Sequence, residues 1–557
     1  MSAGGQDRVL NVNLGVLGHI DSGKTALAKA LSTVASTAAF DKNPQSQARG
    51  ITLDLGFSSL SVTPMPEHLA DLAYDRLQFT LVDCPGHADL IRTIIGGAQI
   101  IDMMMLVVDV NKGIQTQTAE CLVIGEIMCD ILVVALNKID QIPEDQRAQT
   151  IEKVTRGLAK TFATTKFGQV AVIPVAARPA TGPAIGVENL IQVLAKSVPR
   201  QRHDSAAPFV FAVDHCFAIK GQGTVLTGTA LSGQIQVNEN IEIPTAKLSR
   251  KIKSIQMFHR PVQQITAGDR AGICVTQFDA STLERGYACA AGAVIFAHAL
   301  IARVDKVRFF KLPVLSKSRF HVSMGHETVM GTASFFTRDG EGNARFEVDK
   351  EYAFAEELGR PPQENASNSG QPPAPLATFA LIELDHPVAC LSNALLIGSR
   401  LDLDPDVHTK ACRLAFSGRV HEALTDKSYR ETFLPKLKVF KRKSRTGTVE
   451  RILDDYTLIG KGLFKKETTL EPFLGLQVGL SSGEVGEIEG AFGQSGKFRV
   501  RMRQAVSDAT KATLAASDKP KGKGKAPAPE AEAIEIVLSF KRYVYDRQKR
   551  MIQSKDE

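Results

Sequence analysis

The 557-residue sequence has no tryptophan, and none of its cysteines are paired at the C-x-x-C spacing of zinc or redox motifs. Its eight cysteines are scattered, which favours reduced thiols over a disulfide framework. The N-terminal stretch MSAGGQDRVLNVNLG lacks the apolar region of a signal peptide, and the most apolar run, IIDMMMLVVDV, is interrupted by Asp102 and Asp109. We therefore expect a monomeric protein of the cytoplasm with no membrane partner.

Positive charge is concentrated in one part of the chain. Residues 436–466 carry ten Lys or Arg against three acidic residues, an excess equal to the net charge of +7 of the whole sequence. Such a segment is either an ordinary solvated face or the binding surface for a polyanion.

The hydrophobic pattern changes along the chain and predicts several domains. Up to about residue 200, apolar runs such as NVNLGVLG and MMMLVVDV alternate with helical patterns, which indicates a parallel sheet wrapped by helices. Short β-branched runs with Gly turns follow and are typical of antiparallel barrels. Two polar, low-complexity stretches interrupt this later part. The sequence thus predicts an α/β domain at 1–203, β-barrel domains at 204–299 and 300–435, and a C-terminal β-rich basic domain at 436–557, with a flexible insert at 357–376 and a low-complexity insert at 511–533.

The stretch GHIDSGKT, residues 18–25, matches the phosphate-binding pattern G-x-x-x-x-G-K-[ST] directly after an apolar strand. In this pattern Gly18 and Gly23 let backbone N–H groups curl around phosphates, and Lys24 reaches the β and γ oxygens. The Thr25 hydroxyl binds Mg²⁺. The helix that follows adds a favourable dipole for the anion.

Two further motifs end later apolar strands in the order that a GTPase requires. DCPGH places Asp83 at a strand end facing the metal, and Gly86 can offer its N–H group to the γ-phosphate. In NKID, the Asp140 carboxylate can accept hydrogen bonds from N1 and N2 of guanine, which adenine cannot donate. The three motifs together predict an α/β P-loop GTPase domain that binds GTP and Mg²⁺.

These motifs, with RGIT at 49–52, resemble the translational GTPases of the elongation factor Tu and elongation factor 1-alpha class. The resemblance implies that Thr52 coordinates Mg²⁺ with Thr25 and Asp83, and that His87 orients the attacking water. It also implies a hydrophobic gate of Ile20 and Ile51 and a monovalent cation near Asp21. The usual fifth motif, Ser-Ala-Lys or Ser-Ala-Leu, is replaced here by Ala176-Ala177, which loses a hydroxyl but keeps the backbone contact to guanine. The GTP-binding residues assigned in this way are Gly18, His19, Asp21, Ser22, Gly23, Lys24, Thr25, Gly86, Asn137, Lys138, Asp140, Ala176 and Ala177.

A second resemblance extends over nearly all of residues 9–550 and leaves out only the two low-complexity inserts. The stretches VDHCFAIKGQGTVLTGT, GDRAGICVTQF, SMGHETVMG, IGSRLD, LFKKET and GAFGQSGKF closely resemble the eukaryotic-type selenocysteine-specific elongation factors. This resemblance implies a factor that binds selenocysteinyl-tRNA and delivers it to the ribosome at recoded UGA codons, with GTP hydrolysed to GDP and phosphate under stimulation by the ribosome.

An aminoacyl pocket between the first domain and the first barrel is part of that expectation. A selenol is mostly ionised at neutral pH, whereas a serine hydroxyl is not, so a cationic pocket favours selenocysteine. In the resembling family Asp214, His215 and Arg270 match the pocket residues, and Phe57 also approaches it. Strand alternation in VDHCF predicts Asp214 and Cys216 on one face and His215 on the other.

The C-terminal domain shows no run of helices after residue 436, unlike the winged-helix repeats of bacterial factors. It resembles the eukaryotic form, which implies reliance on a separate RNA-binding protein at the selenocysteine insertion element. KVFKRKSR, GLFKK and FKRYVYDRQKR predict contacts with tRNA phosphates. Nuclear localisation is a competing use of the same residues.

Two other functions remain open at this stage. One is a general or initiation-type aminoacyl-tRNA carrier, against which the set of Asp214, His215 and Arg270 argues. The other is a GTP-binding scaffold without hydrolysis, against which His87 argues.

Overall fold

The computed structural model describes most of the chain and divides it into two compact units. Unit 1 comprises the described residues up to 334 together with 357–359 and 379–426, and unit 2 comprises the described residues of 335–356, 376–378 and 427 onward. The described residues are 8–32, 34–35, 55–72, 74–84, 95, 99–200, 206–339, 345–359, 376–403, 412–493, 496–517, 533–548 and 550–553.

Unit 1 begins with a seven-stranded sheet whose strands lie in the order β2 (Val34–Ala35), β3 (Gly56–Val62), β4 (Arg76–Asp83), β1 (Val9–Gly18), β5 (Met103–Asp109), β6 (Leu132–Asn137) and β7 (Ala171–Pro174). The strands from β4 to β7 are parallel, so the parallel sheet expected from the apolar runs is confirmed. β2 and β3 add an antiparallel edge that the apolar runs do not reveal, because β3 is interrupted by serines.

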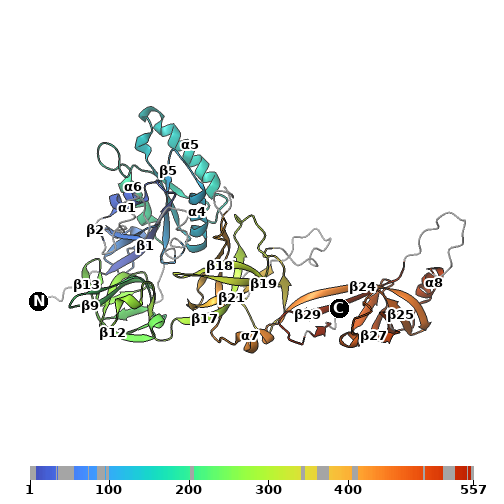
Figure 1. Cartoon of the computed structure of the whole chain (residues 1–557). Coiled ribbons are helices and arrows are strands. Elements are labelled where there is room, and N and C mark those ends of the chain that lie inside the picture. The colour runs from blue at the N-terminus through green and yellow to red at the C-terminus, as the bar shows by residue number, and fades with distance from the viewer. Residues whose placement is uncertain are drawn as a thin grey trace. The chain divides into compact units, whose positions relative to one another are not determined.

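Helices cover both faces of this sheet (Figure 1). The helices are α1 (Lys24–Leu31), α4 (Thr116–Met128), α5 (Glu144–Phe162) and α6 (Val187–Lys196). On one face, Leu27 of α1 and Leu190 of α6 join a core cluster with Met103 and Met105 of β5. On the other face, α4 lies so close to β5 that a Cβ on Gly125 would collide with Met104. We call this part of unit 1 the G domain.

A closed antiparallel barrel follows, as the sequence pattern predicts. Its strands are β8 (Val210–Ile219), β9 (Gly223–Ser232), β10 (Gln234–Gln236), β11 (Asn240–Ile243), β12 (Leu248–Met257), β13 (Arg260–Val262), β14 (Gln264–Thr266), β15 (Arg270–Val275) and β16 (Gly286–Cys289). The order is β11-β16-β8-β9-β15-β12-β13, and pairing of β11 with β12 closes the barrel around an apolar core. We call this part domain II.

The last part of unit 1 is a second barrel, which we call domain III. It contains β17 (Ile295–Lys306), β18 (Ser318–Met324), β22 (Leu395–Ser399) and β23 (Leu414–Leu424), with the first residues of β19 (Glu327–Asp339) and all but the first three residues of β21 (Leu376–Cys390). Pairing of β18 with β22 on one side and β19 on the other completes it. Leu358 is buried and its N–H group donates to the carbonyl of Val314 at 2.9 Å, so the expected insert 357–376 is wrong at its start.

Unit 2 contains a third barrel built from β24 (Val439–Asp454), β25 (Thr457–Lys461), β26 (Gln477–Leu480), β27 (Val485–Phe492), β28 (Lys497–Met502) and β29 (Glu535–Tyr543). β24 pairs with both β25 and β29, which closes the ring (Figure 1). Its core includes Phe464, Phe473, Phe498 and Phe540. β20 (Tyr352–Ala355) pairs in parallel with the start of β24, and β30 (Met551–Ile552) pairs antiparallel with the end of β29. Besides the short helix α7 (Tyr429–Thr432), this unit has the helix α8 (Asp508–Ser517), which includes residues 511–517 of the expected low-complexity insert 511–533.

Most of the cysteines lie in the interior of the protein. All eight cysteines are free, and seven of them are buried. Burial raises the pKa of the Cys121 thiol to about 11, which keeps it protonated and unreactive at neutral pH. Among the described residues no helix is long and apolar enough to cross a membrane.

Candidate functional site

The loop between β1 and α1 has the backbone that phosphate binding requires. Gly18 and Gly23 have φ angles of 148° and 91°, and a Cβ would collide with the Val107 carbonyl at Gly18 and with the Asn137 side chain at Gly23. Asp21 also has a positive φ of 60°. Only glycine fits the two ends of this loop, and the resulting curl turns successive N–H groups toward one point.

Lys24 is buried at the first position of α1, with 6% of its surface exposed. Its Nζ donates to the carbonyl of His19 at 2.9 Å. Burial lowers the pKa of Lys24, although Asp83 and Asp21 partly oppose this shift. An anion bound in the loop would supply the negative charge that this buried ammonium needs.

Two of the residues assigned to Mg²⁺ lie in direct contact. The Thr25 hydroxyl donates to Asp83 Oδ2 at 2.7 Å, and Asp83 ends β4 with 1% of its surface exposed. Both are oxygen ligands, which Mg²⁺ prefers. In the same GHIDSGKT motif as Thr25, the Ser22 hydroxyl is buried and makes no hydrogen bond within the described part of the chain. The donor set therefore fits a magnesium–phosphate group.

Asn137 at the end of β6 connects the phosphate loop to the fifth motif. Its Nδ2 donates to the carbonyl of Ser22 at 2.9 Å, and its Oδ1 accepts from the N–H group of Ala177 at 3.1 Å. Lys138 has a φ of 67° and pairs with Asp109 at 2.9 Å. Asp140 follows in a 3₁₀ turn, Ile139–Gln141. Asn137 thus ties the phosphate loop to the fifth motif, in which Ala176 is fully buried.

Four of the expected residues, Ile51, Thr52, Gly86 and His87, lie outside the described part of the chain. Two other residues contact the site although no motif contains them. The N–H group of Ile20 donates to Gln117 Oε1 of α4 at 3.3 Å, and Asp109 pairs with Lys138. The only sequence signal for Asp109 is its position at the end of an apolar strand, and the pattern gives none for Gln117.

A second constellation lies where the G domain contacts domain II. The Arg270 guanidinium donates to Asp214 Oδ2 at 2.5 Å, and both side chains are more than nine-tenths buried. Asp214 Oδ1 accepts from the hydroxyl of Thr227 at 2.9 Å. The guanidinium also lies 3.2 Å from the ring centre of Phe57, which belongs to β3 of the G domain. The structure thus brings together three residues that the sequence assigns to the aminoacyl pocket.

The expected alternation in VDHCF is wrong because β8 has a bulge at Asp214. Val213 pairs with Gly228 and His215 pairs with Thr227, so Asp214 is an extra residue without a cross-strand partner. The side chain of His215 therefore lies on the same face of the sheet as that of Thr227. The Thr227 hydroxyl also donates to Asp214. Cys216 instead packs against the barrel core. Asp214 and His215 thus lie on the same side of β8.

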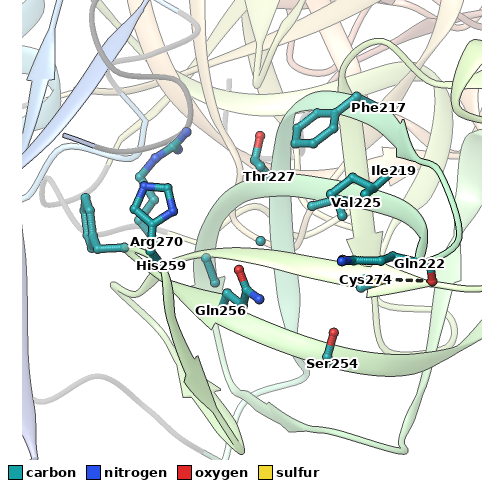
Figure 2. Close-up of a pocket in the computed structure, with 13 residues that line it drawn as sticks. Phe217, Ile219, Gln222, Val225, Thr227, Ser254, Gln256, His259, Arg270 and Cys274 are labelled. Carbon is teal, nitrogen blue, oxygen red and sulfur yellow. Dashed lines mark hydrogen bonds between the residues drawn. The ribbon is translucent and has the colours of Figure 1, made fainter.

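A cavity beside Arg270 was not predicted. Figure 2 shows Arg270 and His259 at one end of it and the apolar side chains of Phe217, Ile219 and Val225 at the other. Phe217 and Ile219 are each 36% exposed, which is unusual for large apolar residues on a barrel strand. Their alternation directly after VDHC is the signal that could have indicated the cavity.

The basic residues of unit 2 include a paired group and an exposed group. Lys541 is buried and pairs with Glu351 at 3.0 Å, and Lys441 pairs with Glu356 at 2.5 Å. Lys443, Lys465 and Lys466 are exposed. Of these five lysines, three therefore lie exposed at the surface of unit 2.

Four family models match the chain in sequence order. The Elongation factor Tu GTP binding domain matches residues 10–200, and Elongation factor Tu domain 2 matches 223–290. The third domain of eukaryotic selenocysteine-specific elongation factors matches 301–418, and the eEFSec C-terminal RIFT domain matches 435–549.

Whole-chain comparisons agree with these matches. The chain is 49% identical to a selenocysteine-specific elongation factor of Mus musculus, over 98% of this chain and 99% of the relative. It is 30% identical to one of Methanocaldococcus jannaschii, over 90% and 97%. The crystal structure of translation elongation factor SelB from Methanococcus maripaludis, in complex with the GTP analogue GppNHp, superposes with a TM-score of 0.68 at 25% identity and covers 97% of this chain and all of that one.

Proposed function

Because the chain belongs to the family of selenocysteine-specific elongation factors, we propose that the phosphate loop and the Arg270 constellation act together in one carrier of charged tRNA. The protein is a translational GTPase that binds GTP, carries selenocysteinyl-tRNA to the ribosome at recoded UGA codons and hydrolyses GTP to GDP and phosphate. The buried Arg270–Asp214 pair beside Phe57 is the observation that carries the aminoacyl part of this proposal.

In the G domain, Lys24 and the N–H groups of the loop bind the β and γ phosphates and stabilise the charge that shifts between them during transfer. Asn137 holds the loop against the segment of Ala177, and Asp140 reads guanine. Gly86 offers its N–H group to the γ-phosphate and His87 positions the attacking water. Because His87 acts on water and not on bound nucleotide, hydrolysis stays slow until the ribosome places it.

Thr25, Asp83 and Thr52 would hold Mg²⁺, and Asp21 a monovalent cation. A bound Mg²⁺ neutralises the charge of the phosphate oxygens. The direct hydrogen bond between Thr25 and Asp83 supports this assignment, since it places two oxygen ligands side by side. Ile20 and Ile51 would restrict access of water to the γ-phosphate.

In the aminoacyl pocket, Arg270 supplies a cation at a site from which water is largely removed. A guanidinium has five N–H donors, so Arg270 can bond Asp214 and still donate to a selenolate. Asp214 fixes the plane of the guanidinium, and the Phe57 ring covers its face. His215 adds a second donor from the same face of β8. A neutral seryl hydroxyl gains much less from these groups, and this difference selects selenocysteine.

The cavity next to Arg270 suits the terminal nucleoside of the tRNA. The aminoacyl group is an ester of the 3′-terminal ribose, so the nucleoside must lie directly beside the aminoacyl pocket. Phe217, Ile219 and Val225 offer an apolar surface to a base, and Gln256 and Ser254 offer polar groups (Figure 2).

The exposed lysines of unit 2 bind tRNA phosphates, and a separate RNA-binding protein at the selenocysteine insertion element is a further partner. The protein acts in the cytoplasm as a monomer, and the same basic residues could also direct nuclear import.

The test is protection of the aminoacyl ester from hydrolysis by the purified protein with GTP or GDP. We expect protection of selenocysteinyl-tRNA with GTP, and much weaker protection of seryl-tRNA on the same tRNA. Equal protection of both forms, or of elongator tRNAs charged with other amino acids, would identify a general carrier instead.

A further inference from the structure

Two asparagines occupy the centre of the G-domain sheet, where apolar residues are the rule. Leu10, Val12 and Leu14 of β1 point into the core shared with α1 and α6. Asn11 and Asn13 alternate with them, so they lie on the opposite face, and they are only 4% and 1% exposed. Buried carboxamides are costly unless they are hydrogen-bonded, so their partners show what this face is for.

Both carboxamides donate to the same acceptor in domain II. Asn11 Nδ2 lies 2.6 Å and Asn13 Nδ2 lies 3.0 Å from the carbonyl oxygen of Gly268. One carbonyl thus accepts two hydrogen bonds from the G domain, which uses both of its lone pairs.

The G domain fixes the orientation of each asparagine. Asn11 Oδ1 accepts from the hydroxyl of Thr80 at 2.9 Å and from Gln78 Nε2 at 3.3 Å, both on β4. These two donors require the Asn11 oxygen on their side and its NH₂ group toward Gly268. Asp102 Oδ2 accepts from the backbone N–H group of Asn13 at 2.7 Å and from its Nδ2 at 3.1 Å.

The held carbonyl belongs to a tight turn that ends at Arg270. Gly268 has a φ of 92° and its N–H group donates to the carbonyl of Ala230 at 2.8 Å. The carboxylate of Asp269 accepts from the backbone N–H group of Thr266 at 2.8 Å and from its hydroxyl at 3.2 Å. Because these bonds leave the turn little freedom, the position of Gly268 determines where β15 starts, and β15 starts with Arg270.

The same face of the sheet also carries Phe57. Phe57 pairs with Val82 on β4, two positions along that strand from Thr80, so the ring lies on the side of Asn11 and Asn13. We infer that Asn11 and Asn13 are positioning residues of the aminoacyl pocket: by holding Gly268 they fix the position of domain II against the G-domain sheet, so that Arg270 of the Arg270–Asp214 pair meets Phe57. They act through Gly268 and do not touch the amino acid. This inference rests on the proposed function.

The variants remove the donors while leaving the rest of the sheet intact. Asn11→Asp keeps the shape and the acceptor for Thr80 but places a carboxylate oxygen against the Gly268 carbonyl. Asn13→Ala removes the second donor, and Asn11→Ala serves as an alternative where the aspartate variant is unstable. Ser58→Ala is the matched control, because Ser58 is equally buried on the opposite face of the same sheet.

The readout is the ratio of ester protection for selenocysteinyl-tRNA over seryl-tRNA, together with GTP affinity. We expect Asn11→Asp with Asn13→Ala to lower the ratio about tenfold, as loss of a buried hydrogen-bond pair suggests, with GTP affinity within about a factor of two of the wild type. Ser58→Ala should leave the ratio unchanged. In an Arg270→Gln background the asparagine variants should have almost no further effect, because the residue that they position is already absent.

Each alternative outcome is distinct. If the wild type is selective and the asparagine variants keep its full ratio of ester protection, this inference is wrong and the proposed function stands. If the effects of the asparagine variants and of Arg270→Gln on this ratio are fully additive, the inference is also wrong, because the asparagines would then act independently of Arg270. A wild type that protects both forms equally overturns the proposed pocket and this inference together.

Discussion

The guanidinium of Arg413 in domain III donates two hydrogen bonds to the carboxylate of Glu120 on α4, at 3.0 and 2.9 Å, with both side chains at least nine-tenths buried. The same helix carries Gln117, which accepts from the phosphate-loop residue Ile20. α4 therefore connects the nucleotide loop to domain III through two polar contacts.

Replacing one member of this pair should destabilise unit 1 strongly. Glu120→Gln leaves a buried guanidinium without its counter-charge, and such changes cost about 3–5 kcal/mol. A double change, Glu120→Met with Arg413→Met, should recover most of the loss, since it removes both charges. Thermal unfolding of these variants and the wild type checks this, and a double variant no more stable than Glu120→Gln would show that the packing of these side chains matters more than their charges.

Domain II should become less stable as the pH rises through about 6. Burial raises the pKa of Asp269 to about 6, against the hydrogen bonds from Thr266, whereas an unfolded aspartate titrates near 4. The protonated form is favoured in the folded state, so this contribution is fully present below about pH 4 and is lost as the pH rises through about 6.

Asp269→Asn should therefore be more stable than the wild type at about pH 7.5 by about 1–3 kcal/mol, and nearly equal to it at about pH 4. The measurement is the difference in unfolding midpoint between the two proteins across this pH range. A constant difference would mean that Asp269 does not titrate there.

Guanine selection should depend on Asp140. A carboxylate that accepts two hydrogen bonds from the base is worth about 1–3 kcal/mol of discrimination. Asp140→Asn should shift preference from GTP toward xanthosine triphosphate, measured by competition binding. Retention of wild-type selectivity would remove Asp140 from the guanine site.

The exposed lysines of unit 2 should govern the salt dependence of tRNA binding. Replacing Lys443, Lys465 and Lys466 by alanine should make the plot of log K against log salt less steep, by roughly 0.7–0.9 for each phosphate that the protein no longer neutralises. Lys441→Ala is the matched control, because its ammonium is already paired with Glu356. An unchanged slope in the triple variant would favour nuclear import as the use of these residues.

The sequence predicts the parts of this protein that local pattern controls. The apolar runs predict the parallel strands. The motif glycines predict the phosphate loop, because they stand where the backbone needs positive φ angles. The bulge at Asp214 could not be predicted, because an extra residue in β8 is defined only by the pairing of β8 with β9, and the local pattern does not contain that pairing. The packing of Leu358 and the buried Glu120–Arg413 pair depend on contacts between segments far apart in the chain. Asn11 and Asn13 did carry a signal, since two amides in a central apolar strand indicate an interface.

The central claim is that Arg270 selects selenocysteine by its charge. The most direct measurement compares ester protection of selenocysteinyl-tRNA and seryl-tRNA by the wild type, Arg270→Gln and His215→Ala, each first shown to bind GTP normally. We expect each variant to lose about 2–5 kcal/mol for the selenocysteinyl form and much less for the seryl form. Arg270→Lys should recover part of the loss, because it restores the charge without the planar guanidinium. Equal losses for the two aminoacyl forms would contradict the account and would show that these residues hold the shared ester end of the tRNA.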